Sequence, residues 1–155
     1  MTISPFIEEN DVSLVTLSLE LEKATIEHET RPNSLYIQEP GMFPFWVNLH
    51  EEPKYILINT YLNFVPTASN EMRLSLCNRI NEKLFLPSTY IHTFEHDGED
   101  EQRFMTAYPI YYRDGLIASH FIRMCRTFSN ALKQIQDEFD RENEILEPLG
   151  RRSRV

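Results

Sequence analysis

The sequence predicts an α+β fold of two layers, in which helices pack on an antiparallel sheet. Two observations predict it. Residues 54–64 alternate with period two, as strands do, whereas residues 68–84 and 117–139 carry apolar side chains at helical steps of three and four. The predicted order of elements is α-β-β-β-α-β-β-α, in a single domain over residues 11–147.

Residues 54–64 are predicted to form the central strand, because they are rich in β-branched and aromatic side chains. Residues 45–50 alternate in the same way and are joined to this strand by only three residues, which predicts a hairpin. One side of the central strand carries Ile56, Ile58, Thr60, Leu62 and Phe64, and the other carries Tyr55, Leu57, Asn59, Tyr61 and Asn63.

The pattern before this hairpin is less decisive. Asp11 or Ser13 can cap a helix that runs to about Ala24, although residues 15–21 also alternate as a strand would. Residues 25–38 hold one strand or two, parted by turn residues.

After the central strand, a helix over residues 68–84 can be capped by Thr67 or Ser69. Residues 88–94 and 102–112 are predicted strands around an acidic loop. The last helix has the longest apolar stripe in the chain: Ile117, Phe121, Met124, Phe128, Ala131, Ile135 and Phe139.

The two ends of the chain lack such patterns. Residues 1–10 are expected to form a flexible lead-in, and residues 148–155 a flexible basic tail.

The composition limits the partners of the chain. Its 24 acidic and 15 basic side chains give a net charge of −9, which disfavours general binding to nucleic acid or to an anionic membrane. No apolar run approaches the ~20 residues of a membrane span, and no signal peptide is visible. Cys77 and Cys125 are therefore expected to be unpaired core thiols of a cytoplasmic protein.

No pattern of residues predicts catalysis. The histidines occur without a His-Glu-x-x-His motif, and on one strand His92 and His96 would lie roughly 13 Å apart. Ser119 and His120 are neighbours on a predicted helix and so face different ways. The four glycines form no phosphate-binding loop. We expect no catalytic residue, no metal and no cofactor.

The candidate binding residues are Trp46, Tyr55, Leu57 and Tyr61, on the outward side of the predicted hairpin. Trp and Tyr are common interface anchors, and an aromatic sheet face needs a cover. A protein partner or a second copy of the chain would supply it; the alternative is that the first helix does. Further aromatic residues are expected to share one face of the later strands: Tyr90, Phe94, Phe104, Tyr108 and Tyr112.

Asn81 lies beside the apolar stripe of the helix over residues 68–84, where its amide is expected to bridge to a strand end. A second functional hypothesis is a small-molecule pocket between the long helix and the sheet, near Asn81 and His120.

The chain resembles the YbjN family, described as regulators of bacterial sensory transduction. The resemblance covers about residues 35–140 and lies in pattern and order. The acidic hairpin contributes to it, together with four segments: Tyr55-Ile-Leu-Ile-Asn-Thr-Tyr-Leu-Asn-Phe64, Leu76-Cys-Asn-Arg-Ile-Asn-Glu-Lys-Leu84, Tyr90-Ile-His-Thr-Phe94 and Asp114-Gly-Leu-Ile117.

The resemblance implies a fold similar to type III secretion chaperones, which are homodimers without enzymatic activity whose clients wrap around apolar grooves. It thus implies a non-enzymatic regulatory protein that binds a protein partner and forms a homodimer. The alternatives are a chaperone-like binder of a client protein and a small-molecule sensor.

Overall fold

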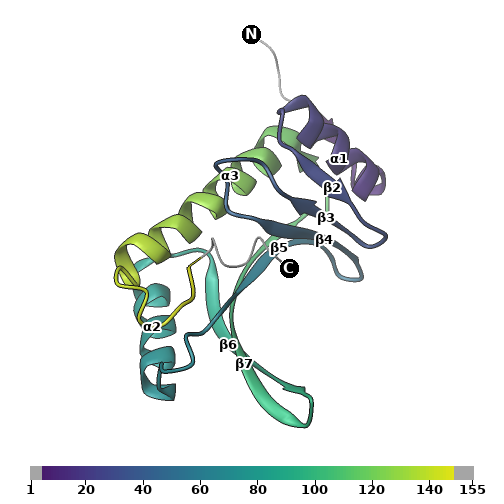
Figure 1. The fold of residues 1–155 in the computed structure, drawn as a ribbon. Coiled ribbons are helices and arrows are strands. Elements are labelled where there is room, and N and C mark those ends of the chain that lie inside the picture. The colour runs from purple at the N-terminus through teal and green to yellow at the C-terminus, as the bar shows by residue number, and fades with distance from the viewer. Residues whose placement is uncertain (1–4, 149–155) are drawn as a thin grey trace. The chain divides into compact units, whose positions relative to one another are not determined.

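The computed structural model describes residues 5–148 (Figure 1). By their contacts they form two compact units, each treated separately below. Unit 1 comprises the described residues of Met1–Asn59 and Tyr108–Asn130, and unit 2 those of Thr60–Ala107 and Ala131–Val155. Residues 11–147 contribute to both units, so the single domain expected there stays a prediction.

The predicted α+β class with antiparallel strands is confirmed, and the strand order of the main sheet is β2-β3-β4-β5-β7-β6. β5 begins in unit 1 and ends in unit 2, β7 runs from unit 2 into unit 1, and α3 begins in unit 1 and ends in unit 2. The elements in chain order are β1 (Phe6–Ile7), the 3-10 turn η1 (Glu9–Asp11), α1 (Leu14–Lys23), β2 (His28–Thr30), β3 (Ser34–Ile37), β4 (Phe45–Glu51), β5 (Lys54–Asn63), α2 (Asn70–Lys83), β6 (Ser88–His96), β7 (Glu99–Tyr111), β8 (Leu116–Ile117), α3 (Ala118–Gln134) and the π-helical turn η2 (Ile135–Phe139).

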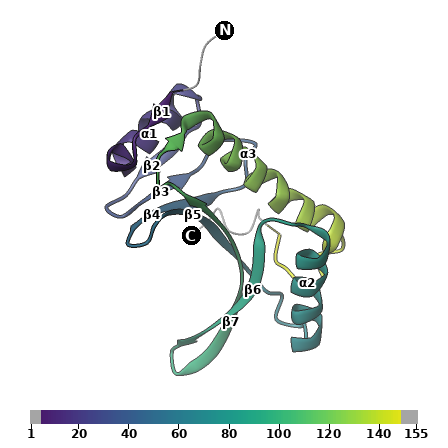
Figure 2. The ribbon, with the colours of Figure 1, turned by 180° about the vertical axis from the view of Figure 1, so that it is seen from behind.

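In unit 1, α1 and the first part of α3 lie on one face of the strands (Figures 1 and 2). Phe128 of α3 meets the ring of Phe45 edge-on, with the ring centroids 5.1 Å apart. Ser18 of α1 shares a 2.6 Å hydrogen bond with Nε2 of His28, which pairs with Ile37 and so lies on the same side of the sheet. The strand side chains of this face are fully buried: Leu35, Ile37, Phe45, Val47, Ile56 and Ile58.

The expectation that the N-terminal segment is a helix is confirmed. Ser13 is its N-cap: the Ser13 hydroxyl accepts from the N–H of Thr16, and the Thr16 hydroxyl accepts from the N–H of Ser13. Two backbone donors are thereby satisfied at the helix start, which favours a helix over the alternating strand. Ser69 caps α2 in the predicted place, since its hydroxyl accepts from the N–H of Met72.

The predicted element order is wrong between α1 and α2, where four strands stand instead of three. The stretch over residues 25–38 forms the antiparallel pair β2 and β3, and its turn is closed by a 2.9 Å bond from the N–H of Arg31 to the carbonyl of Ser34. β2 has three residues and buries none of them, so it leaves no periodic signal in the sequence.

A second departure from the predicted order is the short pair β1 and β8, in which Phe6 lies opposite Ile117. Part of the expected flexible lead-in is therefore a strand, while residues 1–4 lie outside the described residues. Ile117, predicted as the first residue of the helical stripe, is instead in β8 and 52% exposed. The helix begins one residue later, and the N–H of Ala118 donates to the carbonyl of Pro5. Of the expected tail, residues 149–155 also lie outside the described part.

In unit 2, α2 packs against β6 and buries Leu76, Cys77 and Ile80 (Figure 2). The segment after η2 runs beside the end of β5, where Val65 donates to the carbonyl of Ile145. It is held there by Asp140, a residue that is 5% exposed. The Asp140 oxygens accept from three successive backbone N–H groups, those of Glu144, Ile145 and Leu146.

Replacing Asp140 by alanine should destabilise the protein by about 2–3 kcal/mol, because three N–H donors, two of them buried, would lose a charged acceptor. Urea unfolding monitored by circular dichroism would measure this change. Asp137→Ala, at an exposed position three residues earlier, is the control and should change the free energy of unfolding little. Equal effects of the two substitutions would contradict this role of Asp140.

Candidate functional site

The candidate site is the face of unit 1 opposite its two helices, which we call the aromatic face: Tyr36, Trp46, His50, Tyr55, Leu57 and Tyr111. Successive side chains of a strand point to opposite faces of the sheet. The residues between the buried ones therefore form the aromatic face. Within the described part of unit 1, neither α-helix lies on this face. The alternative considered above, that the first helix covers this face, is therefore wrong.

One end of the aromatic face is formed by a cross-strand pair. Tyr36 on β3 lies directly opposite Trp46 on β4, and their ring centroids are 4.9 Å apart. The guanidinium carbon of Arg31 lies 4.6 Å from the centroid of the Tyr36 ring. Such aromatic pairs and cation–π contacts each stabilise by about 0.5–1.5 kcal/mol, so this end of the face is held in place before any partner arrives.

The other end of the aromatic face is a cluster of three rings, two of which are stacked. His50 and Tyr55 are opposite each other on β4 and β5, with the centroids 4.3 Å apart and the planes 9° from parallel. Tyr111 follows at 6.0 Å from Tyr55 and is 68% exposed. Tyr112 points to the buried side, and its hydroxyl donates to the carbonyl of His50 at 2.8 Å. Burial, and after it the carboxylate of Glu51, raises the pKa of Tyr112.

Leu57 lies between the two ends, opposite Asn48. The side-chain amide of Asn48 donates to Oδ1 of Asn59 at 2.6 Å, so the polar groups beside Leu57 bind each other. Trp46, Tyr55 and Leu57 are each half-buried. Three of the four predicted binding residues thus share one face of unit 1.

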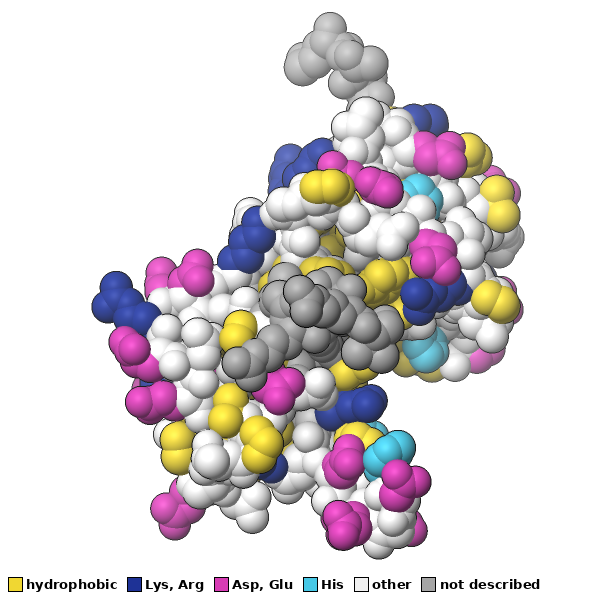
Figure 3. Space-filling view, viewed as in Figure 1, with side chains coloured by type: hydrophobic (Ala, Val, Ile, Leu, Met, Phe, Trp, Pro, Cys, Tyr) yellow, Lys and Arg dark blue, Asp and Glu magenta, His cyan; other side chains and the backbone are white. Residues whose placement is uncertain are grey.

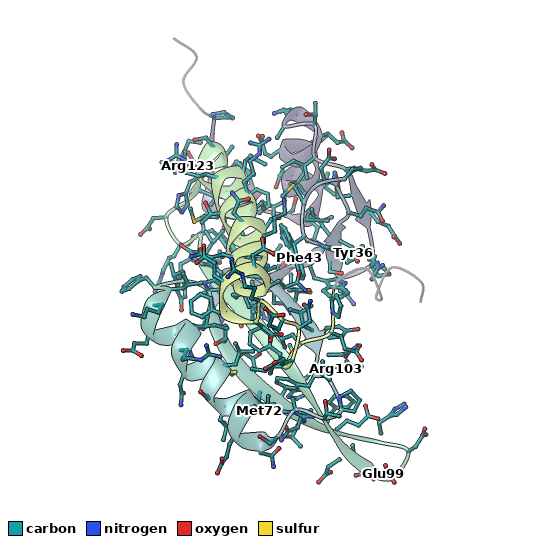
Figure 4. The ribbon with its side chains drawn as sticks, turned by 60° about the vertical axis from the view of Figure 1, so that its left-hand side comes forward. Tyr36, Phe43, Met72, Glu99, Arg103 and Arg123 are labelled. Atoms are coloured by element: carbon teal, nitrogen blue, oxygen red, sulfur yellow. The ribbon has the colours of Figure 1, made fainter. Side chains whose placement is uncertain are left out.

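The fourth predicted residue, Tyr61, belongs to unit 2 and has a different environment. Arg103 of β7 lies over two rings there, 4.3 Å from the centroid of Tyr61 and 4.4 Å from that of Phe94 (Figure 4). This arrangement was not predicted, because cation–π contacts leave no periodic signal.

The predicted grouping of aromatic residues on the later strands is also wrong. Phe104 pairs with Ile91, so it lies on the opposite face from Phe94 and is fully buried. The hairpin turn at Asp97-Gly98 sets this register, and a shift of one residue exchanges the two faces.

The residues of the predicted small-molecule pocket lie in different units. Asn81, in unit 2, uses both ends of its amide on Thr89: its oxygen accepts from the Thr89 N–H and its nitrogen donates to the Thr89 carbonyl, both at 2.9 Å. This is the predicted bridge to a strand end. His120, in unit 1, lines a hollow of about 290 Å³ beside Tyr108 and Tyr111.

No group of three or more His, Cys, Asp or Glu side chains is placed to hold a metal ion among residues 5–148. Within the same residues, no helix combines the length and the hydropathy that a bilayer span requires. Both cysteines are buried and unpaired, and burial raises the pKa of each thiol, most strongly that of Cys125.

The two thiols should therefore stay protonated and react slowly at neutral pH, because the thiolate is the reactive form. Native protein treated with a thiol-reactive dye near pH 7.5 is expected to label at neither position within the time that labels denatured protein at both. Peptide mass spectrometry would identify the labelled residue. Rapid labelling of native Cys125 would show that α3 opens readily.

Comparison with known proteins gives a family and a fold. The YbjN family profile, described as "Putative bacterial sensory transduction regulator", matches residues 11–141. The chain is also similar to the crystal structure of YbjN from E. coli, described as "a putative transcription regulator", with a TM-score of 0.71 and 16% sequence identity. That match covers 88% of this chain and 97% of the other. No curated protein matches the sequence.

Proposed function

This chain belongs to the YbjN family, and on that premise we propose that it is a non-enzymatic regulatory protein that binds another protein through the aromatic face of unit 1. One observation carries the proposal: half-buried aromatic side chains fill a sheet face on which neither helix of the unit packs. Regulation is the function that the family description names, and the aromatic face is our assignment of the surface that performs it.

The chemistry of the aromatic face suits a protein partner. Tyr and Trp bury a large area, keep a polar group for hydrogen bonding, and are enriched where interfaces concentrate their binding energy. The members of the aromatic face include no acidic and no Lys or Arg side chain, whereas Glu29 and Arg31 stand at its edge. An apolar centre with a charged rim is the usual build of a protein interface.

The ring pairs of the aromatic face support the same proposal. Tyr36–Trp46 and His50–Tyr55 are already packed in the free chain, so little side-chain entropy would be lost on binding. The partner would be a regulatory target or a client protein in the cytoplasm, and a second copy of the chain is the alternative occupant.

A small-molecule sensor is the second candidate function. The hollow beside His120 has a volume of about 290 Å³, just below the range of roughly 300–1,000 Å³ for ligand sites. Asn81 does not strengthen this candidate, because its amide is already engaged with Thr89. We therefore favour protein binding.

The test is an affinity pull-down from native cells with the wild type and Trp46→Ala, read by mass spectrometry. We expect a protein that the wild type captures and the variant loses, because truncation of an aromatic hot-spot residue costs about 2 kcal/mol or more of binding energy. Phe85→Ala is the matched control, since Phe85 is an aromatic residue of unit 2 that is 98% exposed. Circular dichroism of each variant should match that of the wild type.

The outcomes separate the candidates. Equal capture by Trp46→Ala and the wild type would contradict binding through the aromatic face. Recovery of the protein itself alone, with a dimer in light scattering that Trp46→Ala disrupts, would make the face a homodimer interface. Complete shielding of Trp46 from fluorescence quenchers in a monomeric wild type would also count against the proposal.

A further inference from the structure

Unit 1 also has a groove of about 560 Å³ between α1 and α3. Its walls include Lys23 and Glu20 from α1, and Arg123 and Arg126 from α3. Dark-blue side chains follow the first part of α3, and Arg123 lies on that part of the helix (Figures 3 and 4). Since both helices pack on the buried face of the strands, this groove and the aromatic face are separate surfaces.

The charge of the groove is opposite to that of the chain. Three basic side chains and one acidic side chain line it, whereas the chain as a whole carries a net charge of −9. The one acid, Glu20, is already engaged, because its carboxylate lies 3.0 Å from Nζ of Lys23. Among residues 5–148, no carboxylate lies within 4.0 Å of the guanidinium nitrogens of Arg123 or Arg126. Two cations therefore remain without a partner of opposite charge there.

Among the described residues, a hydrogen bond explains the position of Arg126, whereas no such bond is seen for Arg123. Arg126 donates to the carbonyl of Ala24 at 3.3 Å and so binds the C-terminal end of α1, where a cation is favourable. Arg123 stands three residues earlier on α3, hence next to Arg126 on the helix surface. Two like charges at this spacing repel each other and destabilise a helix. With an anion bound between them, the two arginines would stabilise the helix instead.

The remaining polar groups of the groove suit the same ligand. Thr127 and Asn130 line it one turn after Arg123 and Arg126, respectively, and add a hydroxyl and an amide that can donate hydrogen bonds. Ala24 and Ala118 are small and leave the space open. Two arginine forks beside neutral donors are the arrangement that binds phosphoryl oxygens well, because each guanidinium can donate two parallel hydrogen bonds.

We propose that the groove between α1 and α3 binds a small ligand that carries phosphoryl groups, with Arg123 and Arg126 as its anion-binding residues. A volume of about 560 Å³ is sufficient for a ligand larger than a single phosphate ion. The proposal does not depend on the aromatic face.

Isothermal titration calorimetry with inorganic pyrophosphate, at constant ionic strength, tests the proposal. We expect saturable binding to the wild type and roughly tenfold or more weaker binding to Arg123→Gln, because a charged donor is lost. Arg113→Gln is the matched control: Arg113 is an exposed arginine of unit 1 outside the groove, and its variant should bind as the wild type does. Trp46→Ala should also keep the wild-type affinity.

Two results would overturn the proposal. One is a failure to support a specific site in the titration with pyrophosphate. The wild type would then show no saturable binding, or Arg123→Gln and Arg113→Gln would bind equally, because general attraction between charges does not distinguish the two arginines. The other comes from a parallel titration with a short polyglutamate peptide. If that peptide binds in an Arg123-dependent way and pyrophosphate does not, the groove recognises an acidic protein segment instead.

Discussion

Alternation along β5 is the constraint on which the rest of the structure depends. Ile56, Ile58, Thr60 and Leu62 are at most 1% exposed, and the residues between them point to the other side. Burial of one such aliphatic side chain contributes about 1.5–3 kcal/mol, so a shift of one residue in register would be prohibitive. The pairing of β5 with β4 then places Trp46, Tyr55 and Leu57 on the same side of unit 1. The aromatic face is thus a consequence of core packing.

The same alternation explains what could be predicted from the sequence. From this alternation the sequence predicted the β4–β5 hairpin, its buried side and three members of the aromatic face. Every second residue of such a strand is apolar, and this pattern shows which side of the strand is buried. Apolar residues at helical spacing predicted α1, α2 and α3. For α1 and α2 the capping residues Ser13 and Ser69 also marked where each helix begins. The family resemblance rested on these segments and is confirmed by the match over residues 11–141.

The features that were not predicted leave no periodic pattern in the sequence. β2 buries no side chain, and the pair β1–β8 has two residues in each strand. Asp140 resembled any other acid near the end of a helix, although it binds three backbone donors. Arg103, between Tyr61 and Phe94, depends on the register of two strands, and the basic groove depends on two helices brought together by the core. Contacts between segments that are distant in the sequence could be identified only from the structure.

The interleaving of the two units has a consequence for synthesis on the ribosome. Unit 2 takes most of its residues from Thr60–Ala107, between the two stretches that form unit 1. The first stretch emerges early, but it must wait for β8 and α3, since Phe6 pairs with Ile117 and Phe45 packs on Phe128. At typical translation speeds of about 5–20 residues per second, its apolar strand faces stay open for several seconds. Nascent chains of this protein therefore offer chaperones a long window in which to bind.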